Sequence, residues 1–441
     1  MLTGAVDPPA PPPLLSEPAP KPSPVRQLLA IVLSLCLGLF LADAALSLAD
    51  DSLILLAGSH VLTVLRELAG LFALAMAILV YLLMGLTPMI PKRLFLPIAL
   101  FNPIGMLVAI PCLIYCHGWM PQVGWVISCF QLSLGLGILC RLQGGLKVSW
   151  RLVPEGRLEG RGFGWLNLVA FLLLNVLVLL PAAAIYLAVC AGLAVDHFSG
   201  GFLALRPSGL TVQVRTYIRN DGKTIQLCPM AHIGEASFYR KVSRSFPTNS
   251  VVLMEGVTDK RNLLTNSITY KRAATSLGLA EQKEEFNPSR GELVMADVDV
   301  EQFSAVTIDF LNLVMLIHAK GVNSGTMARL MQYSPPAHLQ AQIFEDLLHK
   351  RNRRLLEELR SRLAQSENII VPWGVAHMPE IAAAIQESGF RLDESREYQV
   401  VRFRSLFFPQ GKRKPTPRPS RGRDEGVVQP VGPDRAQPPA P

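Results

Sequence analysis

Hydrophobic positions are distributed unevenly along this 441-residue chain and are concentrated in its first half. Five apolar runs have close to the roughly 20 residues, or more, that a helix needs to cross a bilayer; they occupy 27–49, 69–91, 94–116, 122–140 and 164–193. A further apolar stretch, 52–65, is short and interrupted, which is not typical of a complete span. The pattern predicts a membrane α-helical bundle of about five spans over 27–195.

The second half, 200–406, has the short alternating and apolar runs of a soluble α/β domain. Strands are expected at 210–218, 223–228, 250–254, 293–297, 368–373 and 398–403. Helical patterns follow most of them, near 235 and over 269–279, 301–319, 338–365 and 379–388. The first two strands are separated by Asn220-Asp221-Gly222, a hairpin signal.

Composition adds the two ends of the chain and the expected partners. Residues 1–26 and 407–441 are rich in proline and poor in large apolar residues, so neither segment can bury a core and both are expected to be disordered. Only 17% of the residues are charged, against about a quarter in soluble domains. The net charge of +8 comes from the basic tail and the loops. We therefore expect membrane lipid, and no nucleic acid, as a partner.

The orientation of the spans follows from the lysines and arginines that flank them. With the N-terminus inside, the outer loops contain only Arg66, whereas nine basic residues fall on the inner side: Lys21, Arg26, Lys92, Arg93, Arg141, Lys147, Arg151, Arg157 and Arg161. Five spans then place the domain on the outer, periplasmic side of a bacterial-type inner membrane. One additional span, from 52–65 or within 164–193, would place it in the cytoplasm.

Polar residues follow four of the predicted apolar strands at or just beyond their carboxyl ends: His232, Glu255, Asp297 and His377. Ligands of open α/β sheets bind at that edge. The two histidines also lie in a repeated phrase, because 225–235 and 370–380 each end in Ala-His-x-x-Glu. The repeat predicts a duplicated α/β unit with a shared site.

His232, His377 and Glu255 form a ligand set that is common for a divalent metal with an open position for water. A metal lowers the pKa of that water and generates a hydroxide nucleophile. Each residue also has a structural explanation, as a hydrogen-bonded histidine or as a carboxylate that caps the next segment. Glu235 and Glu380 are interpreted as acids of a first helical turn.

Arg351 and Asn352 lie on the apolar face of the predicted helix 338–365. That face is formed by Leu339, Ile343, Phe344, Leu347, Leu348, Leu355, Leu356 and Leu359. A guanidinium on a core-facing stripe is costly unless it is paired. We expect Arg351 to pair with Asp297 or Glu255, or to bind a substrate carboxylate or oxyanion.

Other motifs narrow the class of protein. Gly-rich phosphate loops, Cys-x-x-Cys pairs and Gly-x-Ser-x-Gly elbows do not occur in 200–406, which argues against kinase, zinc-ribbon and serine-esterase functions. Six of the seven cysteines fall in or beside the spans. The seventh, Cys228, is interpreted as a buried strand-end residue, with a nucleophilic role as the alternative.

In these residues the segment of about 210–405 resembles the TraB/GumN/TIKI family, which belongs to a wider superfamily with EreA-type esterases and ChaN. The matching segments are Val252–Glu255, Arg351-Asn352, and Gly374-Val375-Ala376-His377 with Gly389-Phe390 downstream. The first histidine motif departs from the family pattern, because Pro229 precedes Met230-Ala231-His232 where the family has glycine.

The resemblance implies a two-lobed α/β fold with internal duplication and a central site. It implies metal binding by His232, His377 and Glu255, with manganese, cobalt or zinc as the ion. It implies catalytic roles for Glu255, Asp297, Arg351 and Asn352. Proline removes a backbone N–H and fixes φ. If that N–H serves as an oxyanion donor in the family, Pro229 removes it, so a family member that binds its ligand without catalysis is the alternative.

The leading hypothesis is a membrane-anchored, metal-dependent hydrolase that acts on a peptide outside the inner membrane. The alternative is a catalytically silent protein of the same fold that binds a peptide or signal on a membrane platform. A transporter with an accessory domain is a third class, and the scarcity of charge within the spans argues against it.

Overall fold

The computed structural model describes residues 23–145, 151–158, 160, 162–265 and 269–404. The chain divides into two compact units, Met1–Leu205 and Arg206–Pro441, which we describe separately. The tails predicted at 1–26 and 407–441 lie outside the described residues, except that the first helix already begins at Pro24. Three basic residues used for the orientation, Lys21, Lys147 and Arg161, also lie outside.

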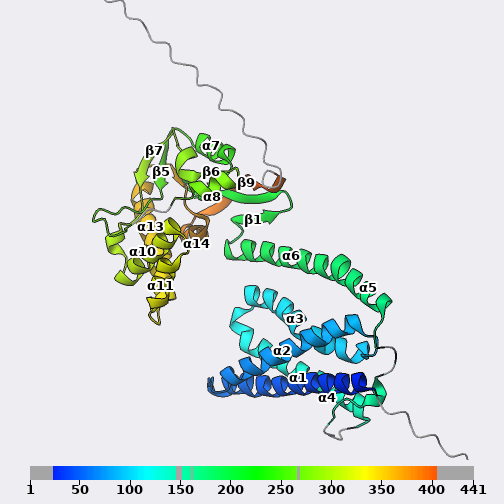
Figure 1. The fold of residues 1–441 in the computed structure, drawn as a ribbon. Helices are drawn as coiled ribbons and strands as arrows, with labels where there is room; N and C mark the ends of the chain where they lie inside the picture. Colours follow the sequence, from blue (N-terminus) through cyan, green and yellow to red (C-terminus); the bar gives the residue numbers. More distant parts are fainter. Residues whose placement is uncertain (1–22, 146–150, 159, 161, 266–268, 405–441) are drawn as a thin grey trace, which may run out of the picture. The chain divides into compact units, whose positions relative to one another are not determined.

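The first unit, called the membrane unit, contains five helices that are long and apolar enough to span a bilayer (Figure 1). They are α1 (Pro24–Ala57), α2 (Thr63–Leu86), α3 (Lys92–Tyr115), α4 (Met120–Gln143) after the 3₁₀ turn η1 (His117–Trp119), and a fifth that consists of α5 (Trp165–Leu174), the π-turn η3 (Asn175–Leu179) and α6 (Leu180–Phe198). Within the described residues, the predicted number of about five long apolar helices is confirmed.

The ambiguous stretch 52–65 is divided between two helices and forms no span of its own. Its first residues extend α1 to Ala57, and its last residues begin α2 at Thr63. Gly58 ends α1 with φ of 63°, a left-handed conformation that glycine adopts at little cost.

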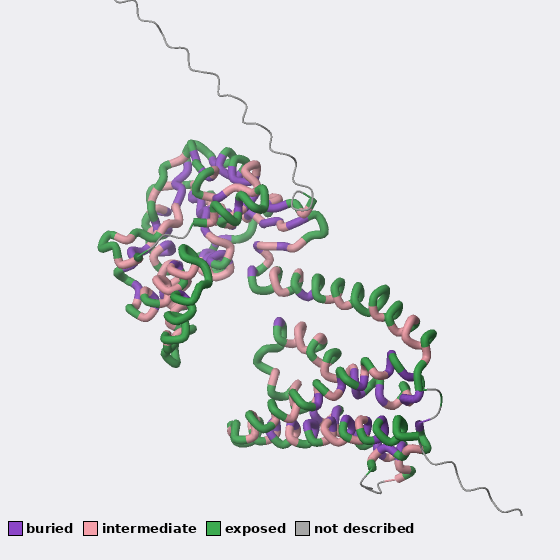
Figure 2. The backbone as a smooth tube through the Cα atoms, in the orientation of Figure 1, coloured by how far each residue is buried: buried purple, intermediate pink, exposed green. Residues whose placement is uncertain are grey.

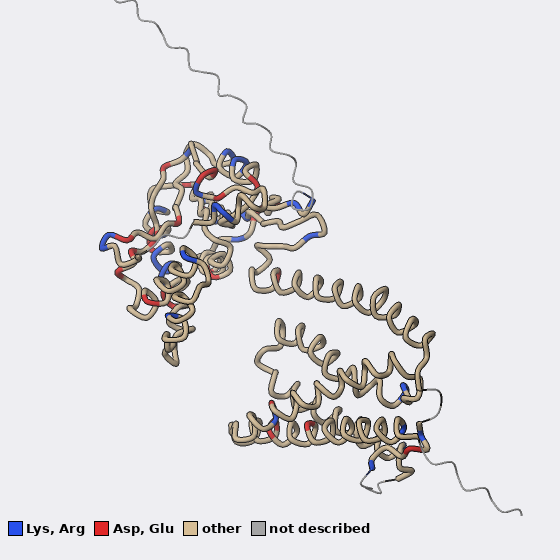
Figure 3. Tube along the Cα trace, in the orientation of Figure 1, with Lys and Arg blue, Asp and Glu red and all other residues tan. Residues whose placement is uncertain are grey.

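The core of the membrane unit lies where α1 packs against α2 and α4, and Figure 2 shows the buried residues gathered there. Many large apolar side chains of these helices point outward, and no residue in the most apolar stretch of the fifth helix is buried. Charged residues are scarce along the helices (Figure 3). A surface of this kind suits lipid and indicates a multi-pass membrane protein.

One polar cluster is buried within this unit, on the face of α1 that carries Asp43, Asp50 and Asp51. Gln131 donates to Asp43 at 2.8 Å, and Arg66 forms ion pairs with Asp50 and Asp51. Each buried carboxylate therefore has a hydrogen-bonding or charged partner, as burial in an apolar medium requires.

The second unit, called the α/β unit, is built on a mixed sheet. Its strands are β2 (Gly209–Ile218), β3 (Thr224–Leu227), β5 (Ser250–Met254), β7 (Glu292–Met295), β8 (Asn368–Val371) and β9 (Arg391–Arg402), while β1 (Leu203–Arg206) crosses the unit boundary. Within the α/β unit, the strands lie side by side in the order β9-β2-β3-β8-β5-β7. Strands β9, β2 and β3 are antiparallel neighbours, and β3, β8, β5 and β7 are parallel. A second sheet pairs β4 (Ile233–Gly234) with β6 (Ala280–Glu281).

Helices follow the strands as the sequence predicts. They are α7 (Ala236–Arg244), α8 (Lys271–Ser276), α9 (Gln282–Glu285), α10 (Ala305–Lys320), α11 (Ser324–Gln332), α12 (Leu339–Phe344), α13 (Lys350–Leu363) and α14 (Met378–Glu387), with the 3₁₀ turns η2 (Glu155–Arg157, in the membrane unit), η4 (Val300–Gln302) and η6 (Val375–His377). The helix predicted over 338–365 is present as a continuous helical stretch over 339–363, in which the π-turn η5 (Glu345–His349) lies between α12 and α13. Phe344, expected on its apolar face, is 52% exposed.

The core of the α/β unit surrounds the two central strands, β5 and β8. Val252, Leu253 and Ile370 are buried, and Leu355 and Leu359 of α13 are buried as well. Strands covered on both faces show continuous apolar runs rather than alternation. The apolar runs of both strands could therefore be recognised in the sequence.

Candidate functional site

The predicted site residues follow the parallel strands of the sheet. Glu255 directly follows β5, Asp297 follows β7, His232 follows β3, and His377 ends the turn η6 after β8. Because these strands run parallel, their carboxyl ends lie at one edge of the sheet. Arg351 reaches the same edge from the first turn of α13.

Arg351 lies at the centre of this group. Its Nε and Nη2 donate to the two oxygens of Asp297 at 3.0 and 2.7 Å, and Nη2 also donates to Glu255 Oε1 at 2.8 Å. The Arg351 side chain is 13% exposed and that of Asp297 is fully buried. Burial lowers the pKa of Arg351, but the ion pairs with Asp297 and Glu255 outweigh burial and raise it above its usual value. The guanidinium is therefore charged.

Backbone donors hold both carboxylates in place. Gly374 N–H donates to Glu255 Oε2 at 2.6 Å. Gly256 N–H and Val298 N–H donate to Asp297 at 3.0 and 2.8 Å. Hydrogen bonds to a charged group from fixed backbone donors pre-organise it, so the positions of the acids do not depend on Arg351 alone.

His377 is buried beside Arg351 and has a defined tautomer. Its Nδ1 lies 2.6 Å from Asn352 Oδ1, and Asn352 Nδ2 donates to Glu380 at 2.7 Å. Since an ionised carboxylate only accepts, the amide oxygen must face His377, and Nδ1 must carry the proton. The lone pair of Nε2 then faces Arg351 Nη1 at 3.3 Å. Burial, followed by the charge of Arg351, lowers the pKa of His377 to about 4.

This lowered pKa predicts a loss of stability in mild acid. The unfolded histidine titrates near pH 6.5 and the folded one near 4, so the unfolded state binds more protons between these values. The stability of the folded state is complete above pH 6.5 and falls as the pH drops to about 4, by roughly 3 kcal/mol. Hydrogen exchange of β5 and β8 in the full-length protein, measured across this pH range, tests the prediction.

The matched control is His377→Gln, which keeps a polar side chain and removes the titrating ring. Its exchange is expected to change with pH less steeply than that of the wild type between 6.5 and 4. Equal pH dependence in the two proteins would show that His377 is not the group responsible.

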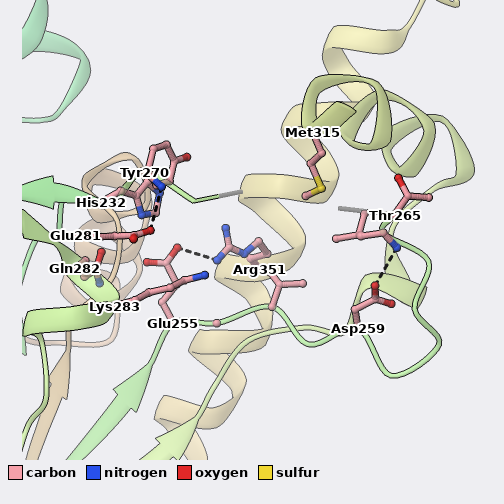
Figure 4. Close-up of a pocket in the computed structure, with 13 residues that line it drawn as sticks. His232, Glu255, Asp259, Thr265, Tyr270, Glu281, Gln282, Lys283, Met315 and Arg351 are labelled. Carbon is pink, nitrogen blue, oxygen red and sulfur yellow. Dashed lines mark hydrogen bonds and ion pairs between the residues drawn. The ribbon is translucent and has the colours of Figure 1, made fainter. Parts of the chain in front are cut away.

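A pocket of about 710 Å³ opens over Glu255 and Arg351 (Figure 4). One wall contains His232, Tyr270 and residues of the β4–β6 ribbon, and Met315 and Thr265 lie on the opposite side. The lining residues are His232, Glu255, Gly256, Val257, Asp259, Leu264, Thr265, Tyr270, Glu281, Gln282, Lys283, Met315 and Arg351. The pocket thus combines a charged floor with a partly apolar, partly aromatic surface.

The two histidines occupy different environments at this edge. His232 is exposed, lines the pocket and stacks on Tyr270 with ring centroids 5.1 Å apart and an interplanar angle of 6°. His377 is 5% exposed and is not among the residues that line the pocket. The structure therefore gathers Glu255, Asp297, Arg351, Asn352 and His377 into one network, while His232 lies on the pocket wall.

A divalent metal was expected at His232, His377 and Glu255, and the donor geometry does not suit one. The Arg351 guanidinium already contacts both His377 Nε2 and Glu255 Oε1, which are 3.8 Å apart. A metal binds such donors at about 2.0–2.2 Å and would lie against this cation. Among the described residues, no group of three or more His, Cys, Asp or Glu side chains is arranged to hold a metal.

Pro229 does not interrupt the hydrogen bonds between the segment that continues β3 and the segment that continues β8. The N–H groups on either side of it, of Cys228 and Met230, donate to Val371 and Trp373 at 2.9 and 2.8 Å. Alternate residues of a strand direct their N–H groups to opposite sides, so position 229 faces away from β8. Cys228 is fully buried, which raises the pKa of its thiol; this agrees with the structural interpretation of Cys228.

Some features of the site were not expected from the sequence. Glu380 lies in the first turn of α14, as expected for a helix-dipole acid, but its carboxylate also accepts from Asn352 and contacts His349. Tyr270 and Lys283 line the pocket without any distinguishing motif. For Glu380, the Ala-His-x-x-Glu repeat was the available signal of a role at the site, since it occupies the same place there as Glu235.

Comparison with known proteins gives no identification. No family model, no curated protein and no solved structure matches the chain. The likeness to the TraB/GumN/TIKI family therefore rests on the residues quoted above.

Proposed function

We propose that the α/β unit is a TraB/GumN-like hydrolase domain that cleaves a peptide while anchored to the membrane. The observation that carries the proposal is the ion pair of Glu255 and Arg351 at the floor of a pocket of about 710 Å³, with the buried Asp297 holding Arg351 from behind. Buried charges are costly unless they serve a purpose or are paired, and strand-end acids that face a cavity are well placed for chemistry. The pocket is large enough for a short peptide segment.

In the proposed reaction Glu255 acts as a general base. It takes a proton from water, whose oxygen attacks the peptide carbonyl carbon. Arg351 stabilises the negative charge that develops on the carbonyl oxygen. Its Nη1 is the arm available for this role, because its contacts to Leu347 O and His377 are long, at 3.5 and 3.3 Å.

Collapse of the tetrahedral intermediate breaks the bond between the carbonyl carbon and the amine nitrogen, and the leaving nitrogen requires a proton. His232 is exposed on the pocket wall and is the residue proposed to deliver it. Glu255 then releases to solvent the proton that it took from water, and His232 takes one up from solvent, which restores both residues. Asp297, Asn352 and His377 act through Arg351 and are positioning residues. Every step uses side chains of this chain, and none depends on a metal.

The proposed family membership includes an internal duplication. Strands β3 and β8 are parallel neighbours with Ile225 paired to Ile369, and each strand leads into an Ala-His pair. Two related half-units whose first strands lie side by side would bring both histidines to one edge. This arrangement supports the two-lobed, duplicated fold that the resemblance implies.

The proposed location is the outer face of a bacterial-type inner membrane. Five membrane helices and the nine-to-one distribution of basic residues support an inner N-terminus and a periplasmic α/β unit. The substrate would then be an extracytoplasmic peptide.

One experiment tests both the reaction and the side of the membrane. Right-side-out vesicles containing the full-length protein are supplied with a peptide library from outside, and the products are identified by mass spectrometry. The wild type is expected to cleave externally added peptides, and Glu255→Gln to reduce the rate by about 10²–10⁴-fold. Glu357→Gln, whose side chain is 63% exposed on the solvent side of α13, is the matched control and should retain the wild-type rate.

Two results would contradict the proposal. Equal cleavage by the wild type and Glu255→Gln would reject the reaction, and cleavage only in inverted vesicles would reject the location. Elemental analysis of the same purified protein tests the expected metal, because a stoichiometric content would mean that Arg351 moves aside to admit it.

The silent peptide-binding protein remains the second candidate for a specific reason. Two of the three guanidinium nitrogens of Arg351, Nε and Nη2, already donate to Asp297 and Glu255, so a substrate has only Nη1 to bind. A wild-type protein that retains peptides without cleaving them would favour this candidate.

A further inference from the structure

A hydrogen-bonded series of side chains leads from the buried His377 to the surface of the α/β unit. His377 Nδ1 lies 2.6 Å from Asn352 Oδ1, Asn352 Nδ2 donates to Glu380 Oε2 at 2.7 Å, and His349 Nδ1 lies 2.9 Å from the same Glu380 oxygen. The proposed reaction assigns no role to Glu380 or His349. Their position at the outer end of this series calls for a physical explanation.

The Asn352 amide has two possible orientations with opposite consequences for His377. With the oxygen toward the ring, Nδ1 carries the proton and Nε2 has a lone pair. With the NH₂ group toward the ring, Nδ1 must accept and Nε2 must carry the proton. Asn352 is completely buried, so the neighbours that contact its amide determine which orientation is populated.

Glu380 selects the first orientation. Its carboxylate only accepts hydrogen bonds, so it requires the NH₂ group of Asn352 on its own side. His349 contacts the same oxygen and holds the carboxylate against Asn352. On the other side of the ring, Arg351 Nη1 donates toward His377 Nε2 at 3.3 Å. A proton on Nε2 would therefore point at a cation that has no lone pair to accept it.

The fold places these residues on separate elements whose ends meet. Asn352 comes from α13, Glu380 from the first turn of α14, and His377 from η6. His349 is the last residue of the π-turn η5, just before α13. π-turns within helices are often found at functional sites, and this one delivers His349 to Glu380.

We propose that Glu380, held by His349, is a positioning residue that sets the tautomer of His377 through the Asn352 amide. The consequence is a permanent lone pair on Nε2 directed at Arg351 Nη1, which holds the guanidinium in its place at the pocket floor. Only the effect on catalysis rests on the proposed function; the tautomer itself is a property of the folded protein.

The test reads the tautomer directly. Full-length protein labelled with ¹⁵N-histidine is prepared in lipid nanodiscs, and the ring nitrogens are observed by NMR, where protonated and unprotonated nitrogens differ strongly in chemical shift. The His377 signals are assigned by their loss in His377→Gln. In the wild type we expect a protonated Nδ1 and an unprotonated Nε2.

Three variants separate the proposed role from a general structural one. Glu380→Ala removes the acceptor and should give a mixture of tautomers, whereas Glu380→Gln retains a carbonyl acceptor and should restore the wild-type spectrum. Asn352→Asp in the Glu380→Ala background should also restore it, since a carboxylate accepts from Nδ1 in either orientation. The Glu380 side chain is 39% exposed, so its truncation leaves no closed cavity.

The outcomes are decisive in both directions. A His377 spectrum that Glu380→Ala leaves unchanged would overturn the inference and assign the tautomer to Arg351 alone. If Glu380→Ala fails to fold, His349→Ala takes its place and should shift the tautomer populations in the same direction; no shift there would overturn the inference. If the spectra agree with the prediction but no peptide is cleaved, the proposed function is rejected and the tautomer assignment is retained.

Discussion

Replacing Arg351 by alanine is expected to lower the free energy of unfolding of the α/β unit by about 3–5 kcal/mol, the usual cost of removing one partner from a buried ion pair. The variant leaves Asp297, whose side chain is fully buried, and Glu255, whose side chain is 15% exposed, without a counter-ion. Hydrogen exchange of β5 and β7 in full-length protein in nanodiscs measures the free energy of opening.

The control variant lies two residues away on the same helix. Arg353 forms a surface ion pair with Glu345, and both side chains are more than 40% exposed. Arg353→Ala is therefore expected to change stability by no more than about 0.5 kcal/mol. Adding Asp297→Asn to Arg351→Ala should recover part of the loss, because it removes the unpaired charge. Similar losses for Arg351→Ala and Arg353→Ala would contradict the central position of Arg351.

Replacing Trp373 by alanine is expected to cost about 3–5 kcal/mol of stability, as for other large buried aromatic residues. Trp373 is fully buried, and its Nε1 donates to Leu253 O at 2.9 Å. Its ring also packs edge-on against His377 at 5.2 Å and lies 5.4 Å from the Arg351 guanidinium. The same residue thus joins β8 to β5 and supports the floor of the pocket.

Trp373→Phe separates the two contributions of this side chain. Phenylalanine keeps most of the ring packing and leaves the buried Leu253 carbonyl without its donor, which costs about 1–3 kcal/mol. Hydrogen exchange of β5 and β8 should therefore rank the proteins as wild type, then Trp373→Phe, then Trp373→Ala. A loss below about 1 kcal/mol for Trp373→Ala would mean that the pocket floor does not depend on this packing.

The elements that could be predicted are those that lie in a uniformly apolar environment. Residues 250–254 were predicted as a strand and form β5 with the same bounds, because a parallel strand covered on both faces shows an unbroken apolar run. The five membrane helices were predicted for the same kind of reason, since a bilayer requires about 20 apolar residues in succession.

The elements that were missed or shortened have no such pattern. Strand β9 runs over Arg391–Arg402, whereas only 398–403 was predicted, because its first seven residues are exposed and all but Leu392 are polar. Its pairing with β2 fixes it in place, and that partner is far away in the sequence. The π-turn η5 was also missed, since the apolar spacing of 338–365 is close to that of a regular helix.

The sequence by itself determined which polar residues reach the carboxyl edge of the sheet, because each of His232, Glu255, Asp297 and His377 follows a strand with a readable apolar pattern. Tertiary structure alone decided their partners. Arg351 meets Asp297 and Glu255 across 54 and 96 residues of chain, and its guanidinium contacts two of the three residues, His377 and Glu255, that were expected to bind a metal. Local patterns depend on neighbours along the chain, whereas ion pairing depends on distances that exist only after the helices have packed on the sheet.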